Sequence, residues 1–197
     1  SPELAAGTLQ AHTLGVNDVG LAFLEAARSR GDRFGPLSWQ HEVAHRLGHQ
    51  RLITDAVLHY LMSDEQQLVM HSRFLELDRG TMPEPALADK VVDYARLHRD
   101  GEEVWRALYP AFPGLVVVLT GLDRAALQRR LAIVIALCND HPALRGRHLG
   151  FPVHFALLED LLVRGPFAPI FVSLEHDGPV DWMDRGPFAA SASRGRP

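Results

Sequence analysis

The run Leu-Val-Val-Val-Leu at residues 115–119 directly follows the turn dipeptide Pro113-Gly114. A short, unbroken run of aliphatic and β-branched residues is typical of a strand that is buried on both faces of a sheet. Helices then cover the sheet on both sides, because neither apolar face can be left to water. This stretch therefore predicts a central strand in an α/β fold.

Strand and helix patterns alternate on either side of this run. In chain order they predict a helix over residues 17–30, strands over 37–44, 52–62 and 67–78, a helix over 86–99, the central strand, a helix over 124–138 and a strand over 152–158. Asn17 or Asp18 can cap the first helix, and Gly31 ends it. A turn at 63–66 joins two of the strands into a hairpin. The order αβββαβ predicts one mixed sheet flanked by helices.

The composition suits one globular domain. The chain has 197 residues, of which 47% are hydrophobic and 22% charged, and this excludes disorder over most of its length. We expect an N-terminal extension over residues 1–11, a core domain over 12–165 and a proline- and glycine-rich C-terminal extension over 166–197. The last residues, 189–197, are predicted to be a disordered tail. Residues 181–184, with Trp182, can be a docking element or an aromatic anchor that packs back onto the domain, and we expect the anchor.

Charge, cysteine content and apolar runs narrow the class of protein. The net charge is −4, so the chain as a whole lacks the basic balance of a dedicated nucleic-acid-binding domain, although a local groove can still be positive. A single cysteine, Cys138, excludes an internal disulfide framework and a cysteine-based zinc site. No apolar run approaches the roughly 20 residues that span a bilayer, and no secretory signal pattern is present. We expect a protein of the reducing cytoplasm with no membrane association.

Carboxylates gather near the end of the third predicted strand. Glu76 and Asp78 alternate with apolar residues and so point to the same face of that strand. Asp55 lies in the preceding strand, and antiparallel pairing can bring it close to them, depending on register. Lys90, the single lysine among 19 arginines, follows on the next helix. Oxygen ligands beside an ammonium suit Mg²⁺ or Mn²⁺, so we predict a metal held by Asp55, Glu76 and Asp78 and assisted by Lys90.

Two other interpretations of these patterns stay open. A Glu-x-Asp pair at a strand end is often a solvated edge or an arginine salt bridge, and a helical lysine usually faces solvent. Separately, residues 41–45 read His41-Glu42-Val-Ala-His45, the spelling of the zincin motif. That motif predicts a zinc hydrolase only where the segment is a continuous helix and a third ligand lies downstream.

A family resemblance rests on several of these segments. The segments are residues 74–81 (Phe-Leu-Glu-Leu-Asp-Arg-Gly-Thr), then Leu87, Lys90 and Tyr94, and upstream residues 12–18 (His-Thr-Leu-Gly-Val-Asn-Asp), Trp39, Glu42, Asp55 and Ala56. Together they resemble the signature of the bacterial replication-relaxation family over about residues 12–130. In that family such domains commonly follow a winged-helix DNA-binding segment. None is visible here, so we expect this chain to be the carboxyl-terminal part of a longer protein or a trimmed piece.

The same layout is similar to the restriction-endonuclease-like superfamily, whose core is αβββαβ. The resemblance implies that Asp55 is the aspartate of the second strand and Glu76 the acidic position of the third. Asp78 stands where that superfamily has a lysine, and Lys90 can restore the amine from the neighbouring helix. Glu42 corresponds to the supporting glutamate, although it follows the first helix instead of lying within it. Thr54 replaces the proline expected before the aspartate.

The resemblance implies a nuclease-like domain that acts on or binds DNA in the replication of plasmids or mobile elements. Its catalytic set would be Asp55, Glu76, Asp78, Lys90 and Glu42. Arg73 and Arg79, near the same strand end, would contact phosphates. The departures from the pattern leave an alternative: a non-catalytic module that binds DNA or a partner protein on a degenerate nuclease core.

Overall fold

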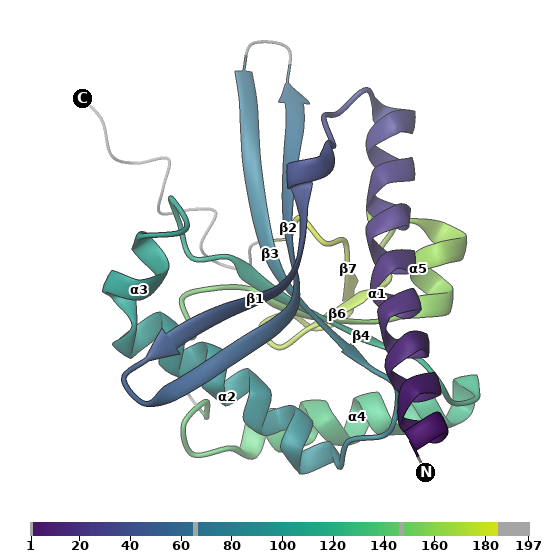
Figure 1. The fold of residues 1–197 in the computed structure, drawn as a ribbon, viewed down its shortest axis with the longest axis vertical. Helices are drawn as coiled ribbons and strands as arrows, with labels where there is room; N and C mark the ends of the chain where they lie inside the picture. Colours follow the sequence, from purple (N-terminus) through teal and green to yellow (C-terminus); the bar gives the residue numbers. More distant parts are fainter. Residues whose placement is uncertain (1, 65–66, 146–147, 185–197) are drawn as a thin grey trace.

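A computed structural model of the chain describes residues 2–64, 67–145 and 148–184. Its centre is a seven-stranded mixed sheet in which the strands follow one another in chain order (Figure 1). The strands are β1 (Trp39–Leu47), β2 (Gln50–Asp64), β3 (Gln67–Asp78), β4 (Gly114–Leu119), β5 (Val153–Leu157), β6 (Phe171–Ser173) and β7 (Pro179–Val180). Strands β1 to β3 form an antiparallel meander, β3 to β5 run parallel, and β6 and β7 return to antiparallel pairing.

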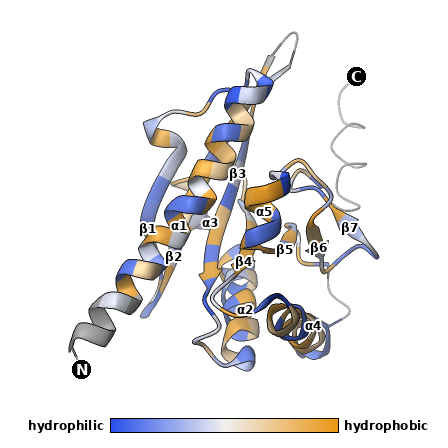
Figure 2. Ribbon diagram, turned by 90° about the vertical axis from the view of Figure 1, so that its right-hand side faces the viewer, coloured by the Kyte–Doolittle hydropathy of each residue, from blue (hydrophilic) through white to orange (hydrophobic). Residues whose placement is uncertain are grey.

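Helices cover both faces of the sheet. They are α1 (Pro2–Arg30), α2 (Glu84–Asp100), α3 (Glu102–Arg106), α4 (Arg124–Asp140) and α5 (Leu158–Arg164), with a 3-10 turn, η1 (Pro36–Ser38). One apolar core lies between the sheet and α2, α3 and α4, and a second lies between the sheet and α1 and α5. Along α1, hydrophobic and hydrophilic turns are interspersed, as expected for a helix with one buried side (Figure 2). The result is a three-layer α/β/α arrangement.

Strand β4 is the centre of this arrangement, as its sequence predicts. All six of its residues are buried. Val117 faces the α2–α4 core, whereas Val116 and Val118 face the α1–α5 core. The crossover from β3 to β4 through α2 makes the two strands parallel, because a helical connection returns the chain to the same end of the sheet. The mixed sheet with helices on both faces is therefore confirmed.

The predicted hairpin is also confirmed, with β2 paired antiparallel to β3 from Ala56↔Leu75 to Asp64↔Gln67. Residues 65–66 of its turn lie outside the described part of the chain. Asp123 caps α4, since its side chain accepts a hydrogen bond of 2.8 Å from the Ala126 amide.

The first helix is longer than the sequence pattern indicates. It begins at Pro2 instead of residue 17, so residues 2–11 of the predicted extension are part of α1. Two glycines of this helix lie directly against the sheet side of the core. A Cβ at Gly15 would lie 2.6 Å from a Leu77 methyl, and one at Gly20 would lie 2.9 Å from the Trp39 ring. A larger residue at Gly20 would press on the Trp39 ring, whereas one at Gly15 would displace the end of the flexible Leu77 side chain.

The last described residues pack back onto the α1 side of the sheet. Trp182 is fully buried and makes edge contacts with Phe23 of α1 and Tyr60 of β2, with ring centroids 5.1 Å apart in each case. The aromatic anchor predicted at residues 181–184 is therefore confirmed, whereas the predicted tail at 189–197 lies outside the described residues. None of the helices described is long and apolar enough to cross a membrane.

Candidate functional site

The candidate site lies where β2 parts from β3. Their paired register stops at Ala56↔Leu75, and beyond it the two strands diverge (Figure 1). Beyond that pair, hydrogen bonds from side chains replace the backbone hydrogen bonds between β2 and β3. The Thr54 hydroxyl donates to the Leu75 carbonyl at 3.0 Å, and the Asp55 carboxylate accepts from the Leu77 amide at 2.8 Å. These two bonds satisfy backbone groups that the ladder would otherwise pair.

Glu76 is the buried centre of the site, with only 2% of its surface exposed. Lys90 Nζ donates to one carboxylate oxygen and forms an ion pair with it. The Tyr94 hydroxyl donates to the other oxygen at 2.5 Å. Lys90 and Tyr94 lie one turn apart on α2, the spacing that puts two side chains on the same face of a helix. Both oxygens of the buried carboxylate are therefore bound by donors from one helix.

The charges of this cluster are coupled. Burial raises the pKa of Glu76 from its usual 4.5 to about 7, even though the neighbouring Lys90 ammonium acts in the opposite direction. The nearby Asp55 carboxylate raises the pKa of Glu76 further. Burial and the adjacent Glu76 also hold the pKa of the Tyr94 hydroxyl well above its usual range. Tyr94 therefore remains a hydrogen-bond donor at any physiological pH.

Asp55 connects this cluster to α1. Its second oxygen lies 3.2 Å from His12 Nε2, so the carboxylate has a partner from α1 as well as from β3. A cavity of about 200 Å³ opens beside it, lined by His12, His41, Glu42 and Asp55 among others. Glu42 lies opposite Asp55 between two paired positions of β1 and β2, with a left-handed φ of 51°. Such a φ is uncommon for a residue other than glycine and turns Glu42 out of the regular ladder.

Asp78 belongs to a different contact. Arg130 of α4 donates to its two oxygens from Nε at 2.5 Å and from Nη2 at 3.1 Å. The same guanidinium binds the Met82 carbonyl and forms an ion pair of 3.0 Å with Glu84. Asp78 therefore fixes α4 and the start of α2 to the end of β3. The prediction that Asp78 joins Asp55 and Glu76 in one metal site is not met, because Arg130 already holds its carboxylate elsewhere.

The described residues do not assemble the predicted three-carboxylate set. No group of three or more histidine, cysteine, aspartate or glutamate side chains among them is placed to hold a metal ion. Both oxygens of Glu76 and both oxygens of Asp55 already have protein partners. The donor set therefore does not fit a three-ligand metal site, and binding of Mg²⁺ or Mn²⁺ stays a prediction.

The zincin interpretation of residues 41–45 is wrong. This segment forms part of strand β1 instead of the helix that the motif requires. His45 is buried and lies 2.8 Å from the Tyr109 hydroxyl, whereas His41 lies on the surface. Burial lowers the pKa of His45, which favours its neutral form.

The two arginines predicted to contact phosphates differ in their surroundings. Arg73 is 6% exposed, donates to the Trp182 carbonyl at 3.0 Å and packs against the Trp182 ring. The Arg73 guanidinium is enclosed by the C-terminal segment, which disfavours a phosphate contact, and that contact stays a prediction. Arg79 is partly exposed just beyond β3, and its contact with phosphate stays a prediction.

Overall, the structure brings Asp55, Glu76 and Lys90 together and places Asp78 and Arg73 elsewhere. Sequence reasoning left two members out of the site, Tyr94 and His12. The spacing of Tyr94, four residues after Lys90, was the available signal, since it puts both side chains on one helix face. His12 had no comparable signal, because the α1 turn that carries it was not recognised as helical.

Comparison with known families adds one finding. The family described as replication-relaxation matches residues 3–112, which is more than half of the chain. The matched part runs from α1 to the segment before β4, and so includes the whole cluster of His12, Asp55, Glu76, Lys90 and Tyr94. No curated protein and no solved structure matches the chain.

Proposed function

The chain belongs to the replication-relaxation family, and on this premise we propose that it is a DNA-binding module built on a nuclease-like core whose acidic centre is neutralised from within. Membership of the family suggests a role in the replication of mobile elements. In this proposal Glu76, Lys90 and Tyr94 stabilise the fold, and residues on the surface bind DNA.

The main support for this proposal is that both carboxylate oxygens of Glu76 already have partners within the protein. A metal-dependent nuclease needs carboxylate oxygens that can coordinate a hard cation. Here the Lys90 ammonium supplies the positive charge, and Tyr94 takes the remaining oxygen. A buried pair of this kind is expensive to break, because removal of one partner leaves an uncompensated charge in the interior. A cation would have to displace Lys90 from a carboxylate that is 2% exposed.

The order of elements supports the nuclease-like origin. The sequence α1, β1, β2, β3, α2, β4 has the αβββαβ order that the superfamily resemblance implies, with a short additional helix, α3, before β4. Asp55, Glu76 and Lys90 come from β2, β3 and α2, the elements expected for its aspartate, its glutamate and a migrated lysine.

Calorimetry with Mg²⁺ and Mn²⁺, combined with DNA binding, tests the proposal. We expect the purified chain to bind a duplex in the presence of a chelator and to show no stoichiometric heat with either cation. The Glu76→Gln variant should bind the duplex as the wild type does, because the carboxylate takes no part in binding. Stoichiometric cation binding that Glu76→Gln abolishes, or failure to bind DNA, would overturn the proposal.

A second candidate function is a metal-dependent phosphodiesterase. It is favoured by the meeting of Asp55, Glu76 and Lys90 and by the rise of the pKa of Glu76 to about 7, since groups that titrate near neutrality cluster at catalytic sites. Two carboxylates can suffice for Mg²⁺, which commonly keeps several waters. Nicking of supercoiled plasmid with Mg²⁺ tests it. Activity should be lost in Glu76→Gln and kept in Glu103→Gln, which changes an exposed glutamate of α3. Nicking that survives Glu76→Gln would remove this candidate.

A further inference from the structure

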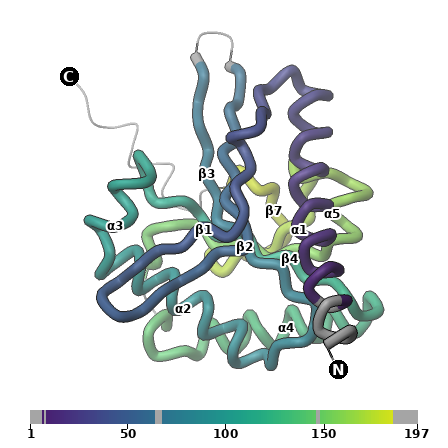
Figure 3. The backbone as a smooth tube through the Cα atoms, viewed as in Figure 1, coloured from purple at the N-terminus to yellow at the C-terminus, as the bar shows by residue number. Residues whose placement is uncertain are grey.

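The hairpin between β1 and β2 extends away from β3 toward α2 and α3 (Figure 1 and Figure 3). A two-residue loop, Gly48 and His49, closes it, and the last pair of the ladder is Leu47↔Gln50. Gly48 has a φ of 59°, the left-handed backbone that tight hairpin loops require at a central position. The tip is therefore a short, regular two-stranded ribbon.

Two arginines lie side by side at this tip. Arg46 and Arg51 are direct cross-strand partners, and both are exposed. Like charges placed directly opposite one another destabilise a sheet. Within the described part of the chain, neither guanidinium forms an ion pair with a carboxylate. The pair is thus an unfavourable arrangement for folding, which an anionic ligand would relieve.

The sequence around this pair of arginines contains no acidic residue. Residues 43–54 contain two arginines and two histidines but no aspartate or glutamate, although the chain as a whole carries a net charge of −4. The tip of the hairpin is therefore locally basic within a chain whose net charge is negative.

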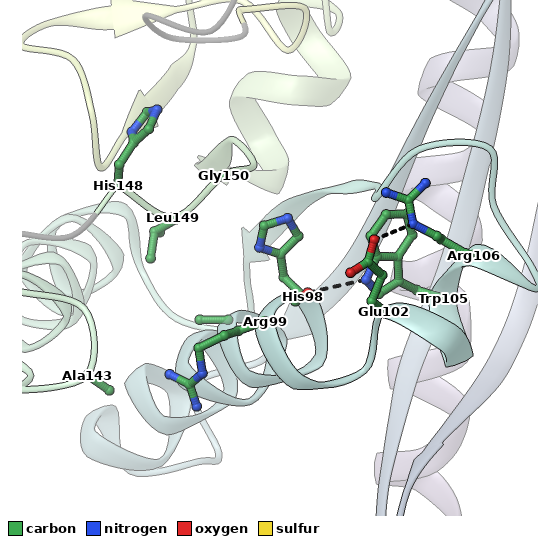
Figure 4. Close-up of a pocket in the computed structure, with 10 residues that line it drawn as sticks. His98, Arg99, Glu102, Trp105, Arg106, Ala143, His148, Leu149 and Gly150 are labelled. Atoms are coloured by element: carbon green, nitrogen blue, oxygen red, sulfur yellow. Dashed lines mark hydrogen bonds and ion pairs between the residues drawn. The ribbon is translucent and has the colours of Figure 1, made fainter.

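The neighbouring arginines behave differently. Arg96, Arg99 and Arg106, on α2 and α3, each form an ion pair with an acid close by in sequence: Asp93, Asp100 and Glu102. Figure 4 shows one of these pairs, Arg106 with Glu102, at a cavity of about 660 Å³ at the end of α2. These side chains are already neutralised within the protein, whereas Arg46 and Arg51 are placed opposite each other and form no such ion pair.

We propose that the β1–β2 hairpin binds double-stranded DNA, with Arg46 and Arg51 contacting neighbouring backbone phosphates. The major groove admits a two-stranded β-ribbon, and arginine is well suited to phosphate. The inference rests on the proposed DNA-binding function and names the surface that carries it. It also accounts for the like-charge pair, because counterion-like phosphates replace the repulsion by attraction.

The double variant Arg46→Gln with Arg51→Gln tests the inference against a matched control. The control is Arg28→Gln with Arg164→Gln, which removes two exposed arginines from α1 and α5, on the other side of the sheet. Binding of a fluorescent 30-base-pair duplex is measured by anisotropy at 50, 100 and 200 mM salt. Thermal unfolding of each variant establishes that it is folded, and removal of the like-charge pair should leave the hairpin variant at least as stable as the wild type.

Loss of two phosphate contacts should reduce the slope of log affinity against log salt by about 1.8, so between 50 and 200 mM the affinity of the wild type should fall about 12-fold further than that of the hairpin variant. The control should keep the wild-type slope. An unchanged slope in the hairpin variant, with DNA binding intact, overturns the inference but leaves the proposed function standing. Preference of the wild type for single strands over the duplex also overturns it. Absence of any DNA binding by the wild type overturns both.

Discussion

Replacing Glu76 by glutamine should remove a specific pH dependence of stability. In the folded protein, burial raises the pKa of Glu76 from 4.5 to about 7. Between these values the folded state binds the proton more tightly than the unfolded state, so unfolding becomes easier as pH rises. The contribution is most favourable below pH 4.5, declines through the window from 4.5 to 7, and is constant above it. Glutamine fills the same space but does not titrate.

The magnitude follows from the size of the pKa change. A rise from 4.5 to about 7 corresponds to about 3 kcal/mol, because each pKa unit is worth roughly 1.4 kcal/mol. We therefore expect the free energy of unfolding of Glu76→Gln, relative to the wild type, to improve by about 3 kcal/mol between pH 4.5 and pH 8. The comparison of the two proteins at each pH cancels the titration of all other groups.

Urea unfolding at pH 4.5, 5.5, 6.5 and 8 measures this difference directly. Glu103→Gln serves as the control, because Glu103 is exposed on α3. A difference between Glu76→Gln and the wild type that stays constant across the series would refute the reasoning. So would a difference that changes in the opposite direction, since a carboxylate stabilised mainly by Lys90 would lose stability as pH falls.

Three further predictions concern packing and ion pairs, each measured by urea unfolding. Asp78→Asn should lower the free energy of unfolding by about 3–5 kcal/mol, because it leaves Arg130 buried without its partner. Asp93→Asn, which breaks an ion pair on the surface, should change it by less than about 1 kcal/mol. Equal effects of the two variants would contradict this prediction. Gly20→Ala should lower the free energy of unfolding by about 1–3 kcal/mol, because its Cβ meets the Trp39 ring. Gly7→Ala, whose Cβ would have nothing within 4 Å, should raise it by up to about 1 kcal/mol. An increase in stability of Gly20→Ala would show that Trp39 moves aside. Trp182→Ala should cost about 3–5 kcal/mol through loss of the aromatic contacts with α1 and β2; a loss below 1 kcal/mol would mean that the segment does not anchor the core.

The parts of the fold that the sequence predicts correctly are those set by local patterns. Strand β4 follows from its unbroken aliphatic run, and the β2–β3 hairpin follows from two β-rich segments on either side of a polar turn. The meeting of Glu76 with Lys90 also follows, because the topology leads from the end of β3 directly into α2. Hydrophobic periodicity and connection length suffice for these features.

The errors arise from partners that are distant in the chain. Arg130 lies 52 residues from Asp78, and the Trp182 carbonyl lies 109 residues from Arg73. No spacing rule connects such pairs, so the sequence alone assigns a carboxylate at a strand end to a metal and a buried guanidinium to phosphate. The first half of α1 carries only a weak sequence pattern. Its glycines, Gly7 and Gly15, weaken the helix locally, and of these only Gly15 lies against the sheet, next to Leu77.

The burial of Trp182 has a consequence for the order in which the molecule can be made. Its ring closes against Phe23 near the beginning of the chain and against Tyr60 in the hairpin. During synthesis from the amino terminus, α1 and the meander emerge long before this side chain does. The α2 side of the sheet can form earlier, since its fully buried residues lie within 57–157. The α1 side must wait for the last contact, and until then it presents apolar surface that a nascent chain has to keep from aggregating.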